Sequence, residues 1–137
     1  MAKGYDEHRA RQDELQRFGR GLARRSGSSC ELCADSGVPL AATEVTPLSE
    51  DPDPERCAFL CDACRDALTA KKLDDIDRWR CLTHTRWSEV APVQVLAVRM
   101  LRRLDTLDVS WARENLEDLY IDPEIEAWID DPREFDR

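Results

Sequence analysis

The sequence contains six cysteines, a residue type that binds metal ions or forms disulfides, and four of them form two C-x-x-C pairs. The first pair is Cys30 and Cys33 in CELC, and the second is Cys61 and Cys64 in CAFLCDAC. Two sulfurs at this spacing can reach one metal ion from a single turn, and two such turns supply the four ligands of a tetrahedral zinc site. The sequence therefore predicts one Zn²⁺ per chain, with iron as the next candidate because thiolate ligands alone do not exclude it.

Four thiolate ligands fill the coordination sphere of zinc and leave no position for an activated water, so the predicted role of the metal is structural. We assign no catalytic residue. Zinc is expected rather than disulfides because the charged N-terminal stretch does not resemble a secretory signal, which favours a cytoplasmic protein with reduced thiols. No run of about 18 apolar residues occurs, so we expect no membrane span.

Two further cysteines and one histidine are the other candidate metal ligands, and a structural or surface role is the preferred interpretation of each. Cys57 alternates with Phe59 in an expected strand and is interpreted as a small buried hydrophobe, with an alternate metal ligand as the other reading. Cys81 is expected to be buried and inert, although nearby arginines could lower its pKa. His84 follows Cys81 in a C-x2-H spacing but lacks partners for a second site, and a surface histidine is the preferred interpretation.

The chain between the two pairs must bring them together, and it holds 27 residues with several prolines and Gly37. Its pattern predicts a knuckle at 30–33, a strand near 40–46, a polar loop and a second strand at 57–60. A helix is expected to begin near Cys61 and to run to about Lys72. These elements form a small zinc module with a β-hairpin.

Helical periodicity dominates elsewhere and predicts an α+β, mostly helical protein. A first helix is expected over 5–25, with Leu15, Phe18 and Leu22 on one face, followed by the flexible joint RSGSS. Later helices are expected near 74–80, from Pro92 to about Leu104, at 111–120 capped by Ser110, and from Pro123 to about 130. The predicted organisation is therefore 1–29, an N-terminal helix and joint; 30–72, the zinc-binding module; and 73–137, a helical segment with an acidic tail.

The strongest helical stripe lies after Pro92 and predicts a buried face. It consists of Val93, Leu96, Ala97, Met100 and Leu104. The tryptophans of the second half, Trp79, Trp87, Trp111 and Trp128, are expected to belong to the core rather than to a binding platform.

The net charge of −9 is unevenly distributed: residues 1–29 carry +3 and residues 108–137 carry −8. The acidic total argues against non-specific binding to nucleic acid. The basic stretch keeps a local version of that possibility open, through Arg9, Arg17, Arg20 and Arg24 against phosphates. A solvated helix face is the alternative reading of these arginines.

The stretch from Cys30 to Leu68 resembles the HNH-nuclease form of the treble clef. CELC, EVTPLSE and FLCDACRDAL follow its order of knuckle, hairpin, knuckle and helix. In such nucleases a hairpin histidine serves as general base, whereas this hairpin has Thr43, Glu44, Val45 and Thr46, and no histidine occurs between His8 and His84. The resemblance therefore implies a shared scaffold without the nuclease activity.

A second resemblance covers about residues 25–130. RSGSSCELC, FLCDACRDAL, DRWRCLTHTRWSEVAPVQVLAVRMLRRL and LEDLYIDPEIEAWI are together similar to the PhnA-type zinc-ribbon proteins of bacteria, a family named for alkylphosphonate utilisation. The resemblance implies a metal-binding module with Cys30, Cys33, Cys61 and Cys64 at its ligand positions. Members commonly continue into a small SH3-like β domain, which is not expected here because the sequence stops at DDPREFDR.

Three main hypotheses on function follow from these observations, and redox or metal sensing through the thiols is the remaining alternative. The leading hypothesis is a non-enzymatic zinc module that binds a partner protein, supported by a saturated metal site and a highly charged exterior. The second is a nucleic-acid binder on a degenerate HNH-like scaffold. The third is an enzyme of phosphonate metabolism, which would need an open metal site or an anion-binding cluster that the sequence does not display.

Overall fold

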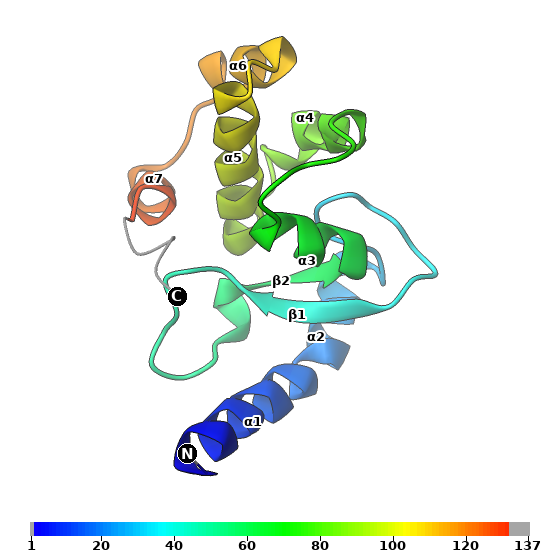
Figure 1. The fold of residues 1–137 in the computed structure, drawn as a ribbon, viewed down its shortest axis with the longest axis vertical. Helices are drawn as coiled ribbons and strands as arrows, with labels where there is room; N and C mark the ends of the chain where they lie inside the picture. Colours follow the sequence, from blue (N-terminus) through cyan, green and yellow to red (C-terminus); the bar gives the residue numbers. More distant parts are fainter. Residues whose placement is uncertain (1, 132–137) are drawn as a thin grey trace.

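A β-hairpin lies at the centre of the fold, with helices on both sides (Figure 1). The structure is a computed structural model that describes residues 2–131. The hairpin consists of β1 (Leu40–Glu44) and β2 (Cys57–Cys61), separated by the short 3₁₀ helix η1 (Pro54–Arg56). The helices are α1 (Ala2–Arg17), α2 (Gly19–Ser26), α3 (Asp62–Thr69), the 3₁₀ helix η2 (Asp77–Cys81), α4 (Leu82–Thr85), α5 (Ala91–Thr106), α6 (Ser110–Glu117) and α7 (Pro123–Ile129). The prediction of a mostly helical α+β protein with one hairpin is confirmed.

Strand β2 is buried on both of its faces. It pairs antiparallel with β1, with Leu40 opposite Cys61 and Glu44 opposite Cys57. Alternate side chains enter two different cores: Ala58 and Leu60 pack with α5, whereas Cys57 and Phe59 pack with Leu15 and Leu22 of the first two helices. A strand covered on both faces has no polar side, which accounts for the unbroken apolar run CAFLC.

The predicted single helix over 5–25 is in fact two helices, α1 and α2, that are interrupted at Phe18. The Phe18 amide bonds to the Leu15 carbonyl at 3.1 Å, which closes a tighter turn than that of an α-helix. Gly19 and Gly21 follow directly, and glycine weakens the helix at this point. The predicted apolar face does meet the hairpin, since Leu15 and Leu22 are buried there and Phe18 packs against them.

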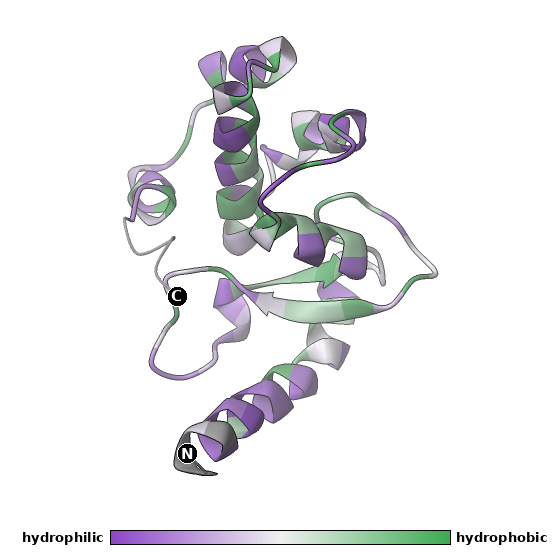
Figure 2. Cartoon of the chain, viewed as in Figure 1, coloured by the Kyte–Doolittle hydropathy of each residue, from purple (hydrophilic) through white to green (hydrophobic). Residues whose placement is uncertain are grey.

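Helix α5 forms the centre of the larger core, and the predicted stripe is buried along its whole length. Figure 2 shows α1 as largely hydrophilic, whereas apolar residues line much of α5. The helix contacts β2, η1, α4, α6 and α7. Core residues from the predicted zinc module, including Leu32 and Leu60, belong to the same cluster as the α5 stripe. The 30–72 and 73–137 segments thus share one core.

Several predicted boundaries differ from those observed. Helix α3 ends at Thr69 rather than near Lys72, because the Arg103 guanidinium binds the Ala67 and Ala70 carbonyls at the helix end. The helix expected near 74–80 is η2, and it continues directly into α4. Ser110 is the first residue of α6 rather than its cap, a position that Val109 occupies. The end of the predicted acidic tail, residues 132–137, lies outside the described residues.

The tryptophans do not all belong to the core as expected. Trp79 is buried, Trp111 and Trp128 are half-buried at its edge, and Trp87 is 47% exposed. Trp87 instead stacks its ring on the guanidinium of Arg86, at 5.0 Å from the ring centroid. Among the described residues, no helix has both the length and the apolar character needed to cross a membrane.

Candidate metal centre

The first cysteine pair lies on a tight knuckle that precedes the hairpin. The Ala34 amide bonds to the Cys30 carbonyl and the Cys30 amide bonds to the Asp35 carbonyl, each at 2.8 Å. Ala34 has a φ of 70°, the left-handed conformation that turns the chain sharply after Cys33. The knuckle thereby directs the sulfurs of Cys30 and Cys33 to the same side.

The second pair lies where β2 passes into α3. Cys61 is the last residue of the strand and the residue before the first turn of the helix, and Cys64 lies within that turn. The amide groups at a helix N-terminus stabilise negative charge, so this position favours thiolates. Because Leu40 pairs with Cys61 in the antiparallel hairpin, the end of β2 lies beside the start of β1. The hairpin thus brings the chain back toward the knuckle that precedes β1.

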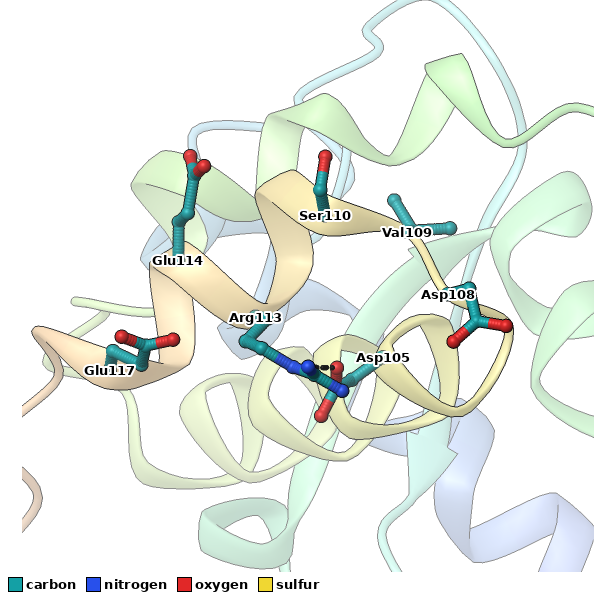
Figure 3. A pocket seen from close by; sticks show the side chains of 7 residues that line it. All are labelled: Asp105, Asp108, Val109, Ser110, Arg113, Glu114 and Glu117. Atoms are coloured by element: carbon teal, nitrogen blue, oxygen red, sulfur yellow. Dashed lines mark hydrogen bonds and ion pairs between the residues drawn. The ribbon is translucent and has the colours of Figure 1, made fainter.

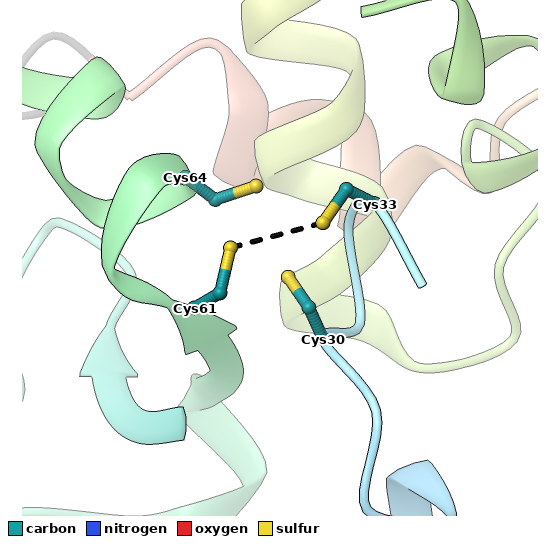
Figure 4. Close-up of side chains that lie close together, drawn as sticks. All are labelled: Cys30, Cys33, Cys61 and Cys64. Atoms are coloured by element: carbon teal, nitrogen blue, oxygen red, sulfur yellow. Dashed lines mark hydrogen bonds between the residues drawn. The ribbon is translucent and has the colours of Figure 1, made fainter. Parts of the chain in front are cut away.

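The four sulfurs converge on one point (Figure 4). All four lie within 4.8 Å of one another, and the Cys33 and Cys61 sulfurs are 3.7 Å apart. A tetrahedral ion with metal–sulfur bonds of about 2.3 Å would place its sulfurs roughly 3.8 Å apart. The cysteines are free rather than disulfide-bonded, so the four thiols are close enough to hold a metal ion.

Electrostatics within the cluster also favour a cation. The pKa of Cys30 lies well below its ordinary value because Cys64 donates a hydrogen bond to its thiolate, and the same interaction raises the pKa of Cys64. Burial raises the pKa of Cys33 to about 12. Without an ion, the cluster therefore keeps protons on some of its sulfurs, since several buried thiolates would repel one another. A divalent ion would displace these protons and remove the repulsion.

A partly buried ion pair joins the knuckle to the rest of the fold. The Arg25 guanidinium binds the Glu31 carboxylate through two hydrogen bonds of 2.6 and 2.9 Å. Glu31 lies between the two ligands of the first pair, and its carboxylate also accepts the Phe59 amide at 2.7 Å. In return, the Glu31 amide bonds to the Phe59 carbonyl. Sequence reasoning missed this pair because the spacing of Arg25 and Glu31 across a joint has no helical or strand periodicity.

Two further contacts from the η2–α4 segment reach the cysteine pairs. Arg78 donates a hydrogen bond from Nη2 to the Cys64 sulfur at 3.0 Å. Thr85 donates its hydroxyl to the Leu32 carbonyl at 2.9 Å, and Leu32 is itself buried in the core. Neither residue was predicted, because nothing in the sequence indicates that 78–85 folds back over the cluster.

The remaining cysteines and the histidine lie outside the four-sulfur cluster. Cys57 is fully buried in the core formed with the first two helices, and its thiol donates to the Asp53 carbonyl at 3.3 Å. Its interpretation as a buried hydrophobe is therefore confirmed. Cys81 is half-buried, and burial raises its pKa, so arginines do not activate it. His84 is exposed, as expected.

The candidate phosphate-binding arginines all lie on the first two helices and are exposed: Arg9, Arg17, Arg20 and Arg24. Other arginines of these helices are engaged within the fold. Arg11 forms an ion pair with Glu44 of β1. Glu44 is thus held as a structural partner of α1.

A cleft of about 290 Å³ is lined by residues of α6 and of the end of α5 that precedes it (Figure 3). This end of α5 lies away from the hairpin (Figure 1). The lining of the cleft is mostly acidic, and Arg113 donates to Asp105 across it at 2.8 Å. The residues around it are Asp105, Asp108, Val109, Ser110, Arg113, Glu114 and Glu117. None of these is a cysteine or histidine, and the cleft is separate from the four-sulfur cluster.

Comparison of the chain with protein-family models, curated proteins and solved structures found no match.

Proposed function

We propose that this chain is a small protein built on a structural zinc centre, in which Cys30, Cys33, Cys61 and Cys64 hold one ion and the folded unit acts as a non-enzymatic binding module. The observation that carries the proposal is the convergence of four sulfurs at separations that suit tetrahedral zinc. Four thiolates would occupy every position around the ion. The centre would then have no site at which a water or substrate could be activated.

The chain around the sulfurs supports a need for metal. Residues 34–39 are exposed, and between the knuckle and η1 only Val45 is buried. Ordering each backbone residue costs roughly 1–2 kcal/mol, which so little apolar burial does not offset. Structural zinc contributes on the order of 10–16 kcal/mol of apparent binding energy in zinc-finger peptides, and this would stabilise the knuckle and hairpin.

The order of knuckle, hairpin and helix agrees with a treble-clef module, and we also propose the relationship to PhnA-type proteins on the motifs given above. We further propose a cytoplasmic location, with support from the free state of the six cysteines. Zinc analysis of the purified chain tests the metal directly. We expect one zinc per chain, and a chain that folds fully with no bound metal would contradict the proposal.

We propose a protein as the partner, because two large aromatic side chains are exposed on segments that an ion pair joins. Tyr120 is 81% exposed and Trp87 is 47% exposed. Each lies close in sequence to a member of the Arg86–Asp118 ion pair, whose 3.3 Å contact joins the two segments. Aromatic residues are enriched at the centres of protein interfaces.

Crosslinking in native extract tests this surface. A photoreactive side chain at position 120 should yield a discrete crosslinked protein, and the additional Trp87→Ala substitution should abolish that product. The same probe at position 48 is the control, since Leu48 is exposed on the loop between the strands. Equal crosslinking from positions 48 and 120 would contradict a binding surface at Tyr120.

A nucleic-acid binder is the second candidate, and one observation favours it. Arg9, Arg17, Arg20 and Arg24 have no ion-pair or hydrogen-bond partner among the described residues, and α1 extends away from the body of the fold (Figure 1). Fluorescence anisotropy with duplex DNA and single-stranded RNA at several salt concentrations tests this reading. Binding that weakens with salt and is lost in an Arg17→Gln, Arg20→Gln, Arg24→Gln variant would support it. Equal binding by that variant would exclude Arg17, Arg20 and Arg24 as the phosphate-binding residues.

A further inference from the structure

Arg78 is placed to act on the cysteine cluster. It lies on η2, 14 residues after Cys64 in the sequence, and its Nη2 donates to the Cys64 sulfur at 3.0 Å. The guanidinium also lies over the ring of Trp79, at 4.9 Å from the centroid, and Trp79 is buried. The cation is therefore held between a fixed indole and one sulfur of the cluster.

The contact between Arg78 and Cys64 bears on the net charge of the metal site. Four thiolates around a divalent ion leave two negative charges in excess. Cys30, Cys61 and Cys64 are buried, so water compensates little of this charge, and burying uncompensated charge is costly. A guanidinium that donates a hydrogen bond to sulfur offsets one of these charges and withdraws electron density from the thiolate.

We propose that Arg78 is a positioning residue of the metal centre, which balances the charge of the tetrathiolate site and thereby favours a divalent ion over a trivalent one. This inference rests on the proposed four-cysteine centre and adds its ion preference. A trivalent ion with four thiolates leaves only one excess charge, so it gains less from a neighbouring cation. Zinc and ferrous iron would thus be stabilised relative to ferric iron.

Arg80 provides a matched control on the same 3₁₀ helix. It carries the same charge two residues further on, but it is exposed and its guanidinium lies over Trp111, at 5.1 Å from the ring centroid. If general positive charge near the cluster were sufficient, Arg78 and Arg80 would be equivalent. If the sulfur contact matters, only Arg78 affects the metal.

Zinc affinity is the first measurement, by competition with a chromogenic chelator on wild type, Arg78→Gln, Arg78→Lys and Arg80→Gln. Outer contacts to metal ligands typically change affinity by about 10- to 100-fold, so we expect a loss in this range for Arg78→Gln. Arg78→Lys should lose less because it keeps the charge, and Arg80→Gln should match wild type. Circular dichroism of the zinc-loaded variants confirms that each is folded.

The Fe³⁺/Fe²⁺ midpoint potential of the iron-substituted protein is the second measurement, because a purely structural role of Arg78 would not change it. Removing a cation near the cluster favours the ferric state, so Arg78→Gln should have a lower potential than wild type and Arg80→Gln should not. If Arg78→Gln does not fold, Arg78→Lys decides: it keeps the charge but loses the guanidinium that donates to the Cys64 sulfur, so a smaller fall in potential, still beyond that of Arg80→Gln, is the expected result.

An unchanged potential in the Arg78 variants, or an equal fall in Arg80→Gln, would overturn the proposal. Either result would leave the four-cysteine centre intact. Failure of wild type to bind zinc or iron through the four thiols would instead refute the proposed function on which this inference rests.

Discussion

The guanidinium of Arg25 binds the carboxylate of Glu31 through two parallel hydrogen bonds, and Glu31 is the residue that follows the first cysteine of the cluster. Only 6% of the Glu31 side chain is exposed, and 24% of the Arg25 side chain. Arg25 also donates to the Cys57 carbonyl at 2.8 Å. One pair of residues thus joins α2, the knuckle and β2, and it anchors the knuckle that carries the first two sulfurs.

Replacing Arg25 with Gln should destabilise the metal-loaded protein. The substitution leaves the buried Glu31 carboxylate without its cation, and an unsatisfied buried acceptor costs about 1–3 kcal/mol, with the partial exposure of Arg25 limiting the loss. Chemical denaturation with zinc present measures the change. Arg24→Gln is the control, because Arg24 is exposed and should change stability by less than about 0.5 kcal/mol. Equal effects of the two substitutions would show that the pair has no structural role.

Single cysteine substitutions should separate the four ligands from the other two cysteines. Cys61→Ser should lose the metal, because a neutral hydroxyl is a poor replacement for a thiolate. Cys57→Ser and Cys81→Ser should keep one zinc per chain, since both sulfurs lie outside the cluster. Metal content of each purified variant is the measurement. Release of zinc by Cys57→Ser with retention by Cys61→Ser would contradict the ligand assignment.

Leu96→Ala should destabilise the protein by about 2–5 kcal/mol, because Leu96 is buried on α5 and truncation leaves a cavity. Leu107→Ala is the matched control at the end of the same helix, where the side chain is 53% exposed. Its effect should be close to zero. Denaturation curves of both variants test the prediction, and a neutral Leu96→Ala would mean that this part of α5 is not core.

Alkaline pH should destabilise the protein through Cys57. Burial raises the pKa of this thiol from its ordinary value of 9.0 to about 11, so the folded state holds the proton after the unfolded state has lost it. The contribution of Cys57 is therefore complete below pH 9 and is lost as the pH rises to 11. Denaturation at several pH values should show a steeper decline for wild type than for Cys57→Ala over this window. Parallel declines would exclude the effect.

The elements of the fold could be predicted wherever one residue pattern dominated. The two C-x-x-C pairs predicted the cluster, the Pro-rich stretch before Cys57 predicted the hairpin loop, and the stripe from Val93 to Leu104 predicted the buried helix. Local patterns could not show which polar groups meet across the fold. Two such contacts arise only in the tertiary structure: Arg25 with Glu31, and Arg78 with Cys64. The local sequence around each arginine is equally typical of a solvent-exposed surface, so it does not predict the contact.

The interruption at Phe18 and the exposure of Trp87 have similar causes. Leu15, Phe18 and Leu22 have helical spacing, so periodicity alone continues the helix through Phe18, while the glycines that follow weaken it. Trp87 was expected in the core from its residue type, but Arg86 occupies the buried position and binds Asn115 and Asp118. A buried arginine with polar partners displaces its aromatic neighbour to the surface.

Hydrogen exchange before and after metal removal tests directly whether the metal at the four cysteines is structural. We expect chelation, verified by metal analysis, to remove protection from β1, β2 and α3, while α5 keeps much of its protection because it also packs against α4, α6 and α7, which carry none of the four cysteines. Restoring zinc should restore the protection. Unchanged protection of α3 in metal-free protein would contradict the structural role of the metal.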